Sequence, residues 1–244
     1  MPSRVQSRMP PGAVWHQKWL HFTALHWPYP PEAVQVVLPP QLRVDIFDGQ
    51  AWVGVTPLIM AGVRPRGLPP LPWLSRFAEV NVRTFVTGPD GSDGLWFFSL
   101  EAARLPFVLA ARAAYGVPYV WASMRGSGPD DGTSSHVSRR RWPWSGVDRV
   151  RVEVKVGEAV PEAEVTDLDV FLTGRWRAFS RHPAGLLVTE ISHPPWPLHR
   201  GTLVDLDQTL LARAGLPPPE GSPEVHYSPG VDVLMGLPRR ARGA

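Results

Sequence analysis

Cysteine is absent from the 244 residues, and lysine occurs only twice, at Lys18 and Lys155. Without cysteine the chain has no disulfide framework, no thiolate zinc ligand and no cysteine nucleophile. The other basic residues are all arginines, which stay charged at any ordinary pH, yet the formal net charge is only +3. The charge balance therefore gives little reason to expect a polyanionic partner.

Long apolar runs and several well-known motifs are also missing. No stretch of 18 apolar residues could span a membrane, and no signal peptide opens the chain, so we expect a cytoplasmic protein without membrane contact. GxGxxG, GxxxxGK[ST] and GxSxG do not occur. HExxH is missing, and the spacing of His16, His21 and His26 suits neither a helix face nor a strand face. We therefore expect no cofactor and no metal.

The chain is arginine-rich and tryptophan-rich without clustering either residue type. The densest basic run is Arg139–Arg141, which we interpret as a solvated strand edge. The eleven tryptophans are spread along the sequence, as core and pocket walls require, rather than gathered on a stacking platform. We expect no nucleic-acid partner.

Proline and glycine, 29 and 22 residues, indicate many turns and few long helices. Residues 1–12 are polar and are expected to form a disordered tail. No repeat or long linker divides the rest, so residues 13–240 are expected to form a single domain.

Hydrophobic periodicity predicts about nine or ten short strands and three or four helices. Asp48-Gly49 lies between two strand-like runs, which is a strong hairpin signal. Arg149–Val156 alternates valines with charged residues and predicts a half-buried strand. Helices are predicted over residues 32–38, about 103–115, 167–179 and 206–214. Because consecutive strands form hairpins, we predict an α+β fold of mostly antiparallel β-structure, with one closed or strongly curved sheet, outer helices and an internal pocket.

Alternation along one predicted strand sends Glu79, Asn81 and Arg83 to the same face. A carboxylate, an amide and a guanidinium in one row can bind a polar ligand inside a cavity. The same row could instead form an exposed face on which Glu79 and Arg83 make an ion pair. The pattern alone leaves both interpretations open.

A second candidate is the segment His193-Pro194-Pro195-Trp196-Pro197. Its three prolines restrict the backbone and hold His193 and Trp196 with little freedom. Rigid loops at sheet ends often carry ligand contacts. The alternative is a packing role in which Trp196 fills the core, and the sequence does not decide between the two.

Five ordered motifs resemble the YqjF-like uncharacterised family (DUF2071), which belongs to the acetoacetate-decarboxylase-like superfamily. They are Trp19 with Leu25-His26-Trp27-Pro28, Asp45–Trp52, Glu79–Thr84, Trp96–Ala102 and His193–Leu198. The likeness extends from about Trp15 to Leu237. It implies a cone-shaped β-barrel with an internal cavity and a few outer helices.

The more distant resemblance to acetoacetate decarboxylase implies roles for individual residues. Glu79 looks like the counterpart of a cavity glutamate. The enzyme's Gly-x-Pro-Lys-Lys stretch, whose first lysine forms the Schiff base, matches Gly116–Val120 here. Tyr119 and Val120 stand in place of both lysines, so the resemblance extends to the fold and not to Schiff-base decarboxylation.

These observations lead to competing functional hypotheses. In the first, the pocket binds a small oxygenated organic acid and the protein is a lyase or proton-transfer enzyme without a Schiff-base lysine. Glu79 is then the catalytic acid or base, and the ligand-binding residues are Asn81, Arg83, Tyr119, His193 and Trp196. In the second, the same residues form a non-catalytic ligand-binding module. In the third, side chains fill the barrel of a structural protein. The sequence does not decide whether the protein is an enzyme, and it does not give the oligomeric state.

Overall fold

The computed structural model describes residues 12–129, 131–143 and 148–243. Most of the expected tail, residues 1–12, lies outside this range. The described strands are β1 (Trp15–Tyr29), β2 (Arg43–Val44), β3 (Ile46–Phe47), β4 (Gln50–Pro65), β5 (Phe77–Thr87), β6 (Asp93–Ala102), β7 (Tyr119–Ser127), β8 (Thr133–Trp142), β9 (Arg149–Ala159), β10 (Arg177–His182), β11 (Gly185–Ser192), β12 (His199–Gln208), β13 (Glu224–Met235) and β14 (Arg239–Arg240). The helices are α1 (Pro31–Gln35), α2 (Leu105–Tyr115), α3 (Asp167–Thr173) and α4 (Leu210–Arg213), with a 3₁₀ turn at Glu162–Glu164.

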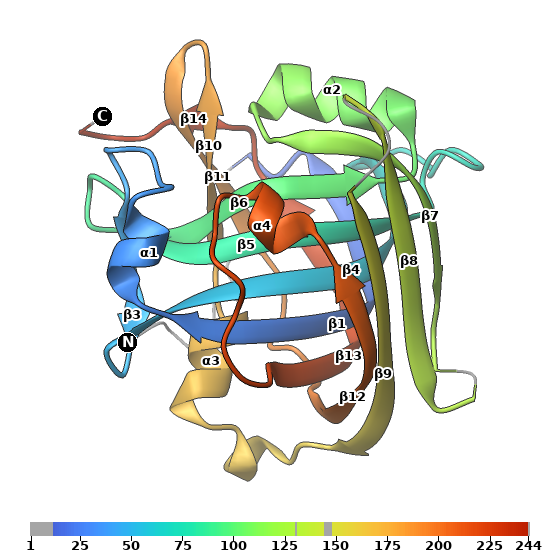
Figure 1. Ribbon diagram of the computed structural model, residues 1–244. Coiled ribbons are helices and arrows are strands. Elements are labelled where there is room, and N and C mark those ends of the chain that lie inside the picture. Colours follow the sequence, from blue (N-terminus) through green and yellow to red (C-terminus); the bar gives the residue numbers. More distant parts are fainter. Residues whose placement is uncertain (1–11, 130, 144–147, 244) are drawn as a thin grey trace.

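All these strands belong to one sheet, and its pairings close into rings (Figure 1). One ring runs through β5, β6, β10, β11, β13, β1 and β4 before returning to β5. A second path leaves β6 through β7, β8, β9 and β12 and rejoins at β13. Of these pairings, β6–β10 and β6–β7 are parallel and the others antiparallel. The predicted fold class is confirmed, and the first ring is compatible with the expected cone.

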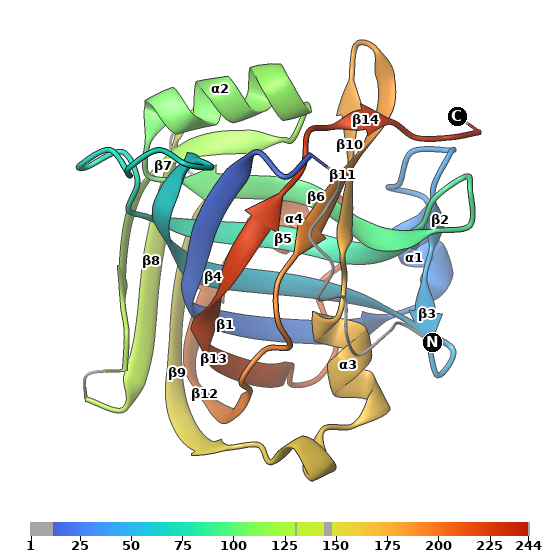
Figure 2. The same ribbon diagram turned by 180° about the vertical axis from the view of Figure 1, so that it is seen from behind.

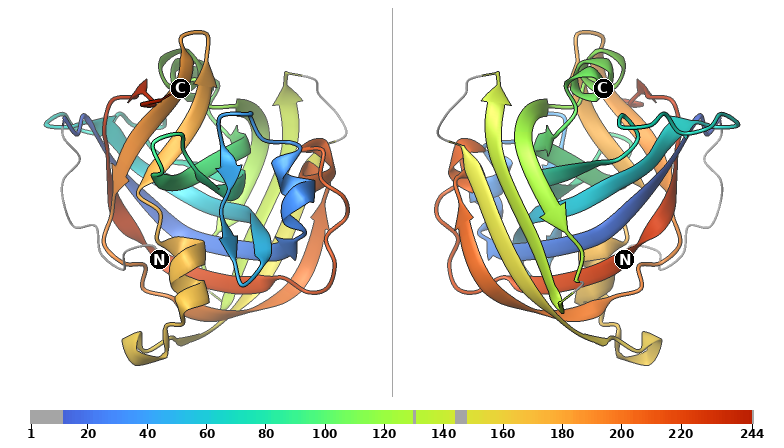
Figure 3. Two further views of the ribbon diagram at one scale, coloured as in Figure 1. Left: turned by 90° about the vertical axis from the view of Figure 1, so that its left-hand side faces the viewer. Right: turned by 90° about the vertical axis from the view of Figure 1, so that its right-hand side faces the viewer.

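The helices lie outside the strands. Figure 2 shows α2 and α3 on opposite sides of the molecule, at the top and the bottom of that view. The right-hand view of Figure 3 shows β7, β8 and β9 as a curved wall. Within the described residues, no helix is long and apolar enough to cross a membrane.

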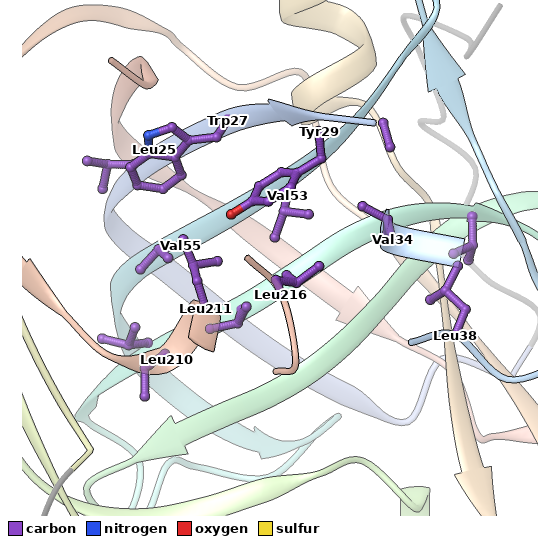
Figure 4. Close-up of a cluster of buried hydrophobic side chains, with 14 of the residues drawn as sticks. Leu25, Trp27, Tyr29, Val34, Leu38, Val53, Val55, Leu210, Leu211 and Leu216 are labelled. Atoms are coloured by element: carbon purple, nitrogen blue, oxygen red, sulfur yellow. The ribbon is translucent and has the colours of Figure 1, made fainter. Parts of the chain in front are cut away.

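Two hydrophobic cores share the strands common to both rings. The first contains valines of β4, β5 and β9 together with leucines of α4, and Figure 4 shows Leu210, Leu211 and Leu216 against Val53 and Val55. The second contains mainly aromatic and aliphatic residues of the first ring, together with Phe171 and Leu172 of α3. Because alternate residues of a strand point to opposite faces, β1, β4 and β5 contribute side chains to both cores.

The hairpin signal at Asp48-Gly49 is confirmed. Both residues have positive φ, 51° and 76°, as a two-residue turn between paired strands requires. They connect β3 to β4, which pair in antiparallel fashion. At the N-terminal side, Trp15–Tyr29 forms β1, which pairs with β4 and β13.

Three predicted helices are too long, and the one predicted over residues 32–38 ends at Gln35. The helix predicted over 167–179 ends at Thr173, and Arg177–His182 forms β10 instead. These residues pair with both β11 and β6, and the ladder hydrogen bonds override the local helical spacing. Similarly, the residues before Thr209 extend β12 along β9, which leaves only Leu210–Arg213 helical.

The interpretation of Arg139–Arg141 as a solvated edge is wrong for its central residue. Arg139 and Arg141 are exposed, but Arg140 points inward and is buried. Its guanidinium contacts Glu101 on β6, with Nη2 2.6 Å from Oε1, and its Nη1 lies 3.1 Å from Oδ2 of Asp148. Alternation along β8 therefore splits the run between two faces.

Candidate functional site

Strand β5 carries the row of polar residues that the sequence singled out. Glu79, Asn81 and Arg83 are only 3%, 7% and 6% exposed, and all three line an internal cavity. Val80 and Val82 point the other way, into the first core. The described residues include no ion pair between Glu79 and Arg83, so the row is not an exposed salt-bridged face.

The cavity lies inside the first ring and has a volume of about 180 Å³. Its wall is mainly apolar and is contributed by strands of the ring and by α2. The lining residues include Trp15, Trp19, Phe22, Leu58, Met60, Val63, Leu95, Phe97, Leu100, Phe107, Ala110, Ala111, Ala114, Val117, Ala178, Ile191 and Met235. Polar groups thus meet an apolar chamber, which is the usual composition of a small-molecule pocket.

Glu79 and Tyr119 form a buried pair at the cavity wall. The Tyr119 hydroxyl donates to Oε2 of Glu79 across 2.9 Å. Burial raises the pKa of Glu79 to about 7, and the hydrogen bonds from Tyr119 and Asn81 only partly oppose this rise. Burial and the neighbouring Glu79 hold the pKa of Tyr119 well above its ordinary value. At neutral pH the pair therefore combines a neutral phenol with a carboxyl group that can take up or release a proton.

Arg83 is a buried cation without a carboxylate partner in the described part of the chain. Its Nη2 donates to the Leu172 carbonyl near the end of α3, across 3.2 Å, and its guanidinium lies over the rings of Phe22 and Phe85. Burial and the charge of Arg175 lower its pKa to about 9, so it stays protonated at neutral pH. Its Nε has no hydrogen-bond partner, and Asn81 Oδ1 also has none. An anionic ligand would supply the missing partner of the guanidinium.

His26 lies behind Arg83 and was not expected there. It is fully buried, and neither ring nitrogen has a hydrogen-bond partner. Burial, and then the charges of Arg83 and His226, lower its pKa well below the usual value, so the ring is neutral. The ring packs over Gly54, where a Cβ would lie only 2.5 Å from His26 Cδ2. Single-sequence spacing gives no signal for this contact, because the two residues meet only through the β1–β4 pairing.

His193 and Trp196 are not among the residues that line this cavity. Trp196 stacks on Phe22, with ring centroids 4.3 Å apart, so it lies behind the cavity wall. His193 packs on Trp176 with centroids 4.5 Å apart. Burial and, to a smaller degree, Arg83 lower its pKa to about 4. Both residues border a separate pocket of about 380 Å³. The structure thus brings Glu79, Asn81, Arg83 and Tyr119 together and places the other two candidates one layer away.

Helix α2 supplies cavity residues that the sequence reasoning missed. Phe107, Ala110, Ala111 and Ala114 recur at positions i, i+3, i+4 and i+7 and form one face of the helix. That spacing is visible in the sequence and indicates a helix face directed inward. The sequence does not show that the face covers a cavity rather than a filled core.

Neither lysine can serve chemistry in the cavity. Lys18 and Lys155 are both exposed, and neither is among the lining residues. Over the described ranges, no cluster of three or more His, Asp or Glu residues could hold a metal ion. The described lining residues offer a carboxyl group, amides, a guanidinium, phenols and the hydroxyl of Thr189.

Comparison with known proteins assigns the chain to a family. The family model DUF2071, described as an uncharacterized conserved protein, matches residues 16–232. The chain belongs to the DUF2071 family. Uncharacterized protein YqjF of Bacillus subtilis (strain 168) is 31% identical over 227 residues, which is 92% of each chain. The expected family resemblance is confirmed.

Solved structures with similar folds are acetoacetate decarboxylases and related proteins. Acetoacetate decarboxylase from Legionella pneumophila superposes with a TM-score of 0.64 at 15% identity, over all of the DUF2071 chain and 94% of its own. The enduracididine biosynthesis enzyme MppR, solved with pyruvate, gives 0.63 at 14% identity, over 96% and 92% of the two chains. An acetoacetate decarboxylase-like enzyme from Sphingomonas wittichii RW1 gives 0.62 at 13% identity, over 98% and 95%. At these identities the likeness establishes the fold alone.

Proposed function

We propose that the cavity binds a small oxygenated organic acid, with Arg83 as the carboxylate anchor and Glu79 as the proton-transferring group. The observation that carries this proposal is the buried Arg83 guanidinium, which faces the cavity without a carboxylate partner in the described residues. Burying a lone charge is costly, so an anionic ligand would gain most of its affinity here. A related fold supports the choice of acid, because MppR was solved with pyruvate.

The reaction class that suits these groups is proton transfer at a carbon next to a carbonyl, as in an isomerase or a lyase. Ionised Glu79 removes the proton from that carbon. The C–H electron pair then forms a carbon–carbon double bond, and the carbonyl π electrons move onto the oxygen. Ionised Glu79 accepts the hydrogen bond from the Tyr119 hydroxyl. Once Glu79 is protonated it is a weaker acceptor, so the phenol can donate to the new oxyanion instead. Glu79 then returns its proton to carbon, or to a leaving hydroxyl that departs as water. A carboxyl pKa of about 7 suits both transfers at neutral pH.

The first test measures binding. Small carboxylic and oxo acids are screened by thermal shift against the wild type, Arg83→Met and the exposed control Arg139→Met. An acid present at about 100 times its Kd should stabilise the wild type and the control by roughly 2.7 kcal/mol. The same acid should stabilise Arg83→Met much less. Equal stabilisation of all three proteins would contradict the anchoring role of Arg83.

The second test separates an enzyme from a binding module. Exchange of the carbon-bound protons of a bound acid into deuterated water is followed by NMR, with wild type and Glu79→Gln. If Glu79→Gln loses the exchange but still binds the acid, the result supports Glu79 as the proton-transfer group. Equal loss of exchange and binding favours recognition alone, and exchange at the wild-type rate in Glu79→Gln would refute its role. No exchange in the wild type, with binding intact, would favour the non-catalytic module.

A further inference from the structure

The cavity is divided into a polar side and an apolar side. Asn81 Oδ1 and Arg83 Nε, the unpartnered buried polar atoms among its lining residues, both lie on β5. Two polar side chains elsewhere in the wall, Gln17 and Tyr115, are already engaged, and Thr189 on β11 adds a hydroxyl group. Gln17 donates to Met235 Sδ and accepts from Trp19, and the Tyr115 hydroxyl donates to the Gly236 carbonyl. A ligand's polar end therefore meets unpartnered buried atoms on the β5 side, where the Tyr119 hydroxyl also lies beside Glu79.

The opposite side is built for a hydrocarbon group. Helix α2 presents Phe107, Ala110, Ala111 and Ala114 to the cavity, and Phe107 is held by ring contacts to Phe77 and Tyr119. Ala110 and Ala114 are exposed as well as lining, so they stand at the mouth, whereas Ala111 is half-buried. Three alanines on this face leave space that larger side chains would fill.

The volume exceeds what a carboxylate and a carbonyl alone would need. An apolar protein cavity of about 150 Å³ accommodates a benzene molecule, and this cavity has about 180 Å³. A ligand with only a methyl group beyond its carbonyl would leave the side chains on the α2 side without van der Waals contacts. A second carboxylate would lie there without a cation, because Arg83 on the β5 side is the one Lys or Arg among the described lining residues.

We propose that the ligand is an oxo monocarboxylic acid with an apolar tail, carboxylate toward Arg83 and tail beneath α2, and that the α2 alanines limit the size of the tail. This proposal rests on the proposed function, because it assumes an acid anchored at Arg83. It adds a substrate class, namely oxo acids whose alkyl or aryl tail extends beneath α2 toward the exposed mouth.

The experiment measures Kd for a series of 2-oxo acids by isothermal titration calorimetry. The probes are pyruvate, 2-oxobutanoate, 2-oxohexanoate, 2-oxooctanoate and phenylpyruvate, with 2-oxoglutarate as the dicarboxylate. Wild type should bind about fourfold more tightly for each added methylene until the cavity is full. 2-Oxoglutarate should bind no better than pyruvate.

Variants of α2 test the role of the alanines. Ala111→Leu should weaken binding of 2-oxohexanoate and phenylpyruvate at least tenfold and leave pyruvate within about threefold. Ala114→Leu, at the exposed mouth, is the second variant in case Ala111→Leu fails to fold. Ala113→Leu is the matched control, because Ala113 is exposed on the same helix and does not line the cavity. The control should bind every acid as the wild type does.

The outcomes separate the two proposals. If the acids bind and Arg83→Met weakens all of them, but affinity does not depend on the tail, the tail proposal is overturned and the proposed function stands. The tail proposal is also overturned if 2-oxoglutarate binds as tightly as 2-oxohexanoate, or if Ala113→Leu acts like Ala111→Leu. If no acid binds, or if Arg83→Met has no effect, the proposed function fails and the tail proposal fails with it.

Discussion

The carboxyl group of Glu79 is buried, and burial disfavours its ionised form. Burial raises its pKa from the ordinary 4.5 to about 7, in spite of the hydrogen bond from Tyr119. The folded protein therefore binds a proton between these two pH values that the unfolded chain has already released. A raised folded pKa means that stability is highest at low pH and falls as pH rises through about 7.

Replacing Glu79 by Gln should remove this pH dependence. Each pH unit between the two pKa values is worth about 1.4 kcal/mol, so the wild type should lose about 3 kcal/mol relative to Glu79→Gln between pH 4 and pH 8. Urea unfolding at a series of pH values measures the difference. Glu158→Gln, at an exposed carboxyl, is the control and should parallel the wild type. A constant gap between wild type and Glu79→Gln would show that the buried carboxyl titrates normally.

Arg140 is buried and its neighbour Arg139 is exposed, so the two can be compared directly. Its guanidinium makes two hydrogen bonds to Glu101 Oε1, and Ser138 donates to the other carboxylate oxygen. Arg140→Met would leave the fully buried Glu101 without its cation and should cost about 3–5 kcal/mol. Arg139→Met, at an exposed neighbour, should change stability by less than about 0.5 kcal/mol. Denaturant unfolding of both variants checks this, and similar losses would argue against the ion pair.

Residue-level prediction from sequence succeeds where strand alternation decides the answer. The shared face of Glu79, Asn81 and Arg83 follows from the geometry of any strand. Burial of that face does not follow, since it depends on pairing with strands far away in sequence. The prolines around His193 and Trp196 indicate a rigid loop, but the position of Trp196 behind Phe22 results from tertiary packing.

At the level of elements, β1 and β4 pack closely where the ring of His26 on β1 lies over Gly54 on β4. A Cβ on Gly54 would meet His26 Cδ2 at 2.5 Å and Nε2 at 2.6 Å. Gly54→Ala should therefore destabilise the protein by about 1–3 kcal/mol through overpacking. In the background of His26→Ala, where the ring is gone, the same substitution should cost much less. Unfolding free energies of the two single variants and the double variant form the cycle that measures the coupling. Simple additivity would contradict a direct clash.

The lengths of the elements were harder to predict than their types. Spacing in 167–179 is helical throughout, yet only Asp167–Thr173 forms the helix. Thr166 and Asp169 begin α3 with a reciprocal capping box. The early end reflects β10, whose residues gain ladder partners on both edges. Single-sequence periodicity contains no information about such partners.

At the scale of the whole molecule, the pairings that close the sheet join distant parts of the sequence. β1 pairs with β13 from Trp15↔Met235 to His26↔Glu224, so the first described strand is the neighbour of the last but one. The sequence predicted a closed or strongly curved sheet from the number of hairpins. It did not indicate that two rings share β13, β1, β4, β5 and β6. That sharing places the acid-binding candidate in one ring and a separate valine-rich core in the other.

Because the two cores share these strands, we expect residues 13–240 to unfold in one cooperative transition. Val152 belongs to the first core and Val233 to the second, and both are fully buried. Val152→Ala and Val233→Ala should each cost about 2 kcal/mol. Each should shift the same single transition, whether it is followed by far-UV circular dichroism or by the fluorescence of the dispersed tryptophans. Two transitions, each moved by only one of the variants, would show instead that the rings are separate folding units. The chain would then have to be described as two domains that share a sheet.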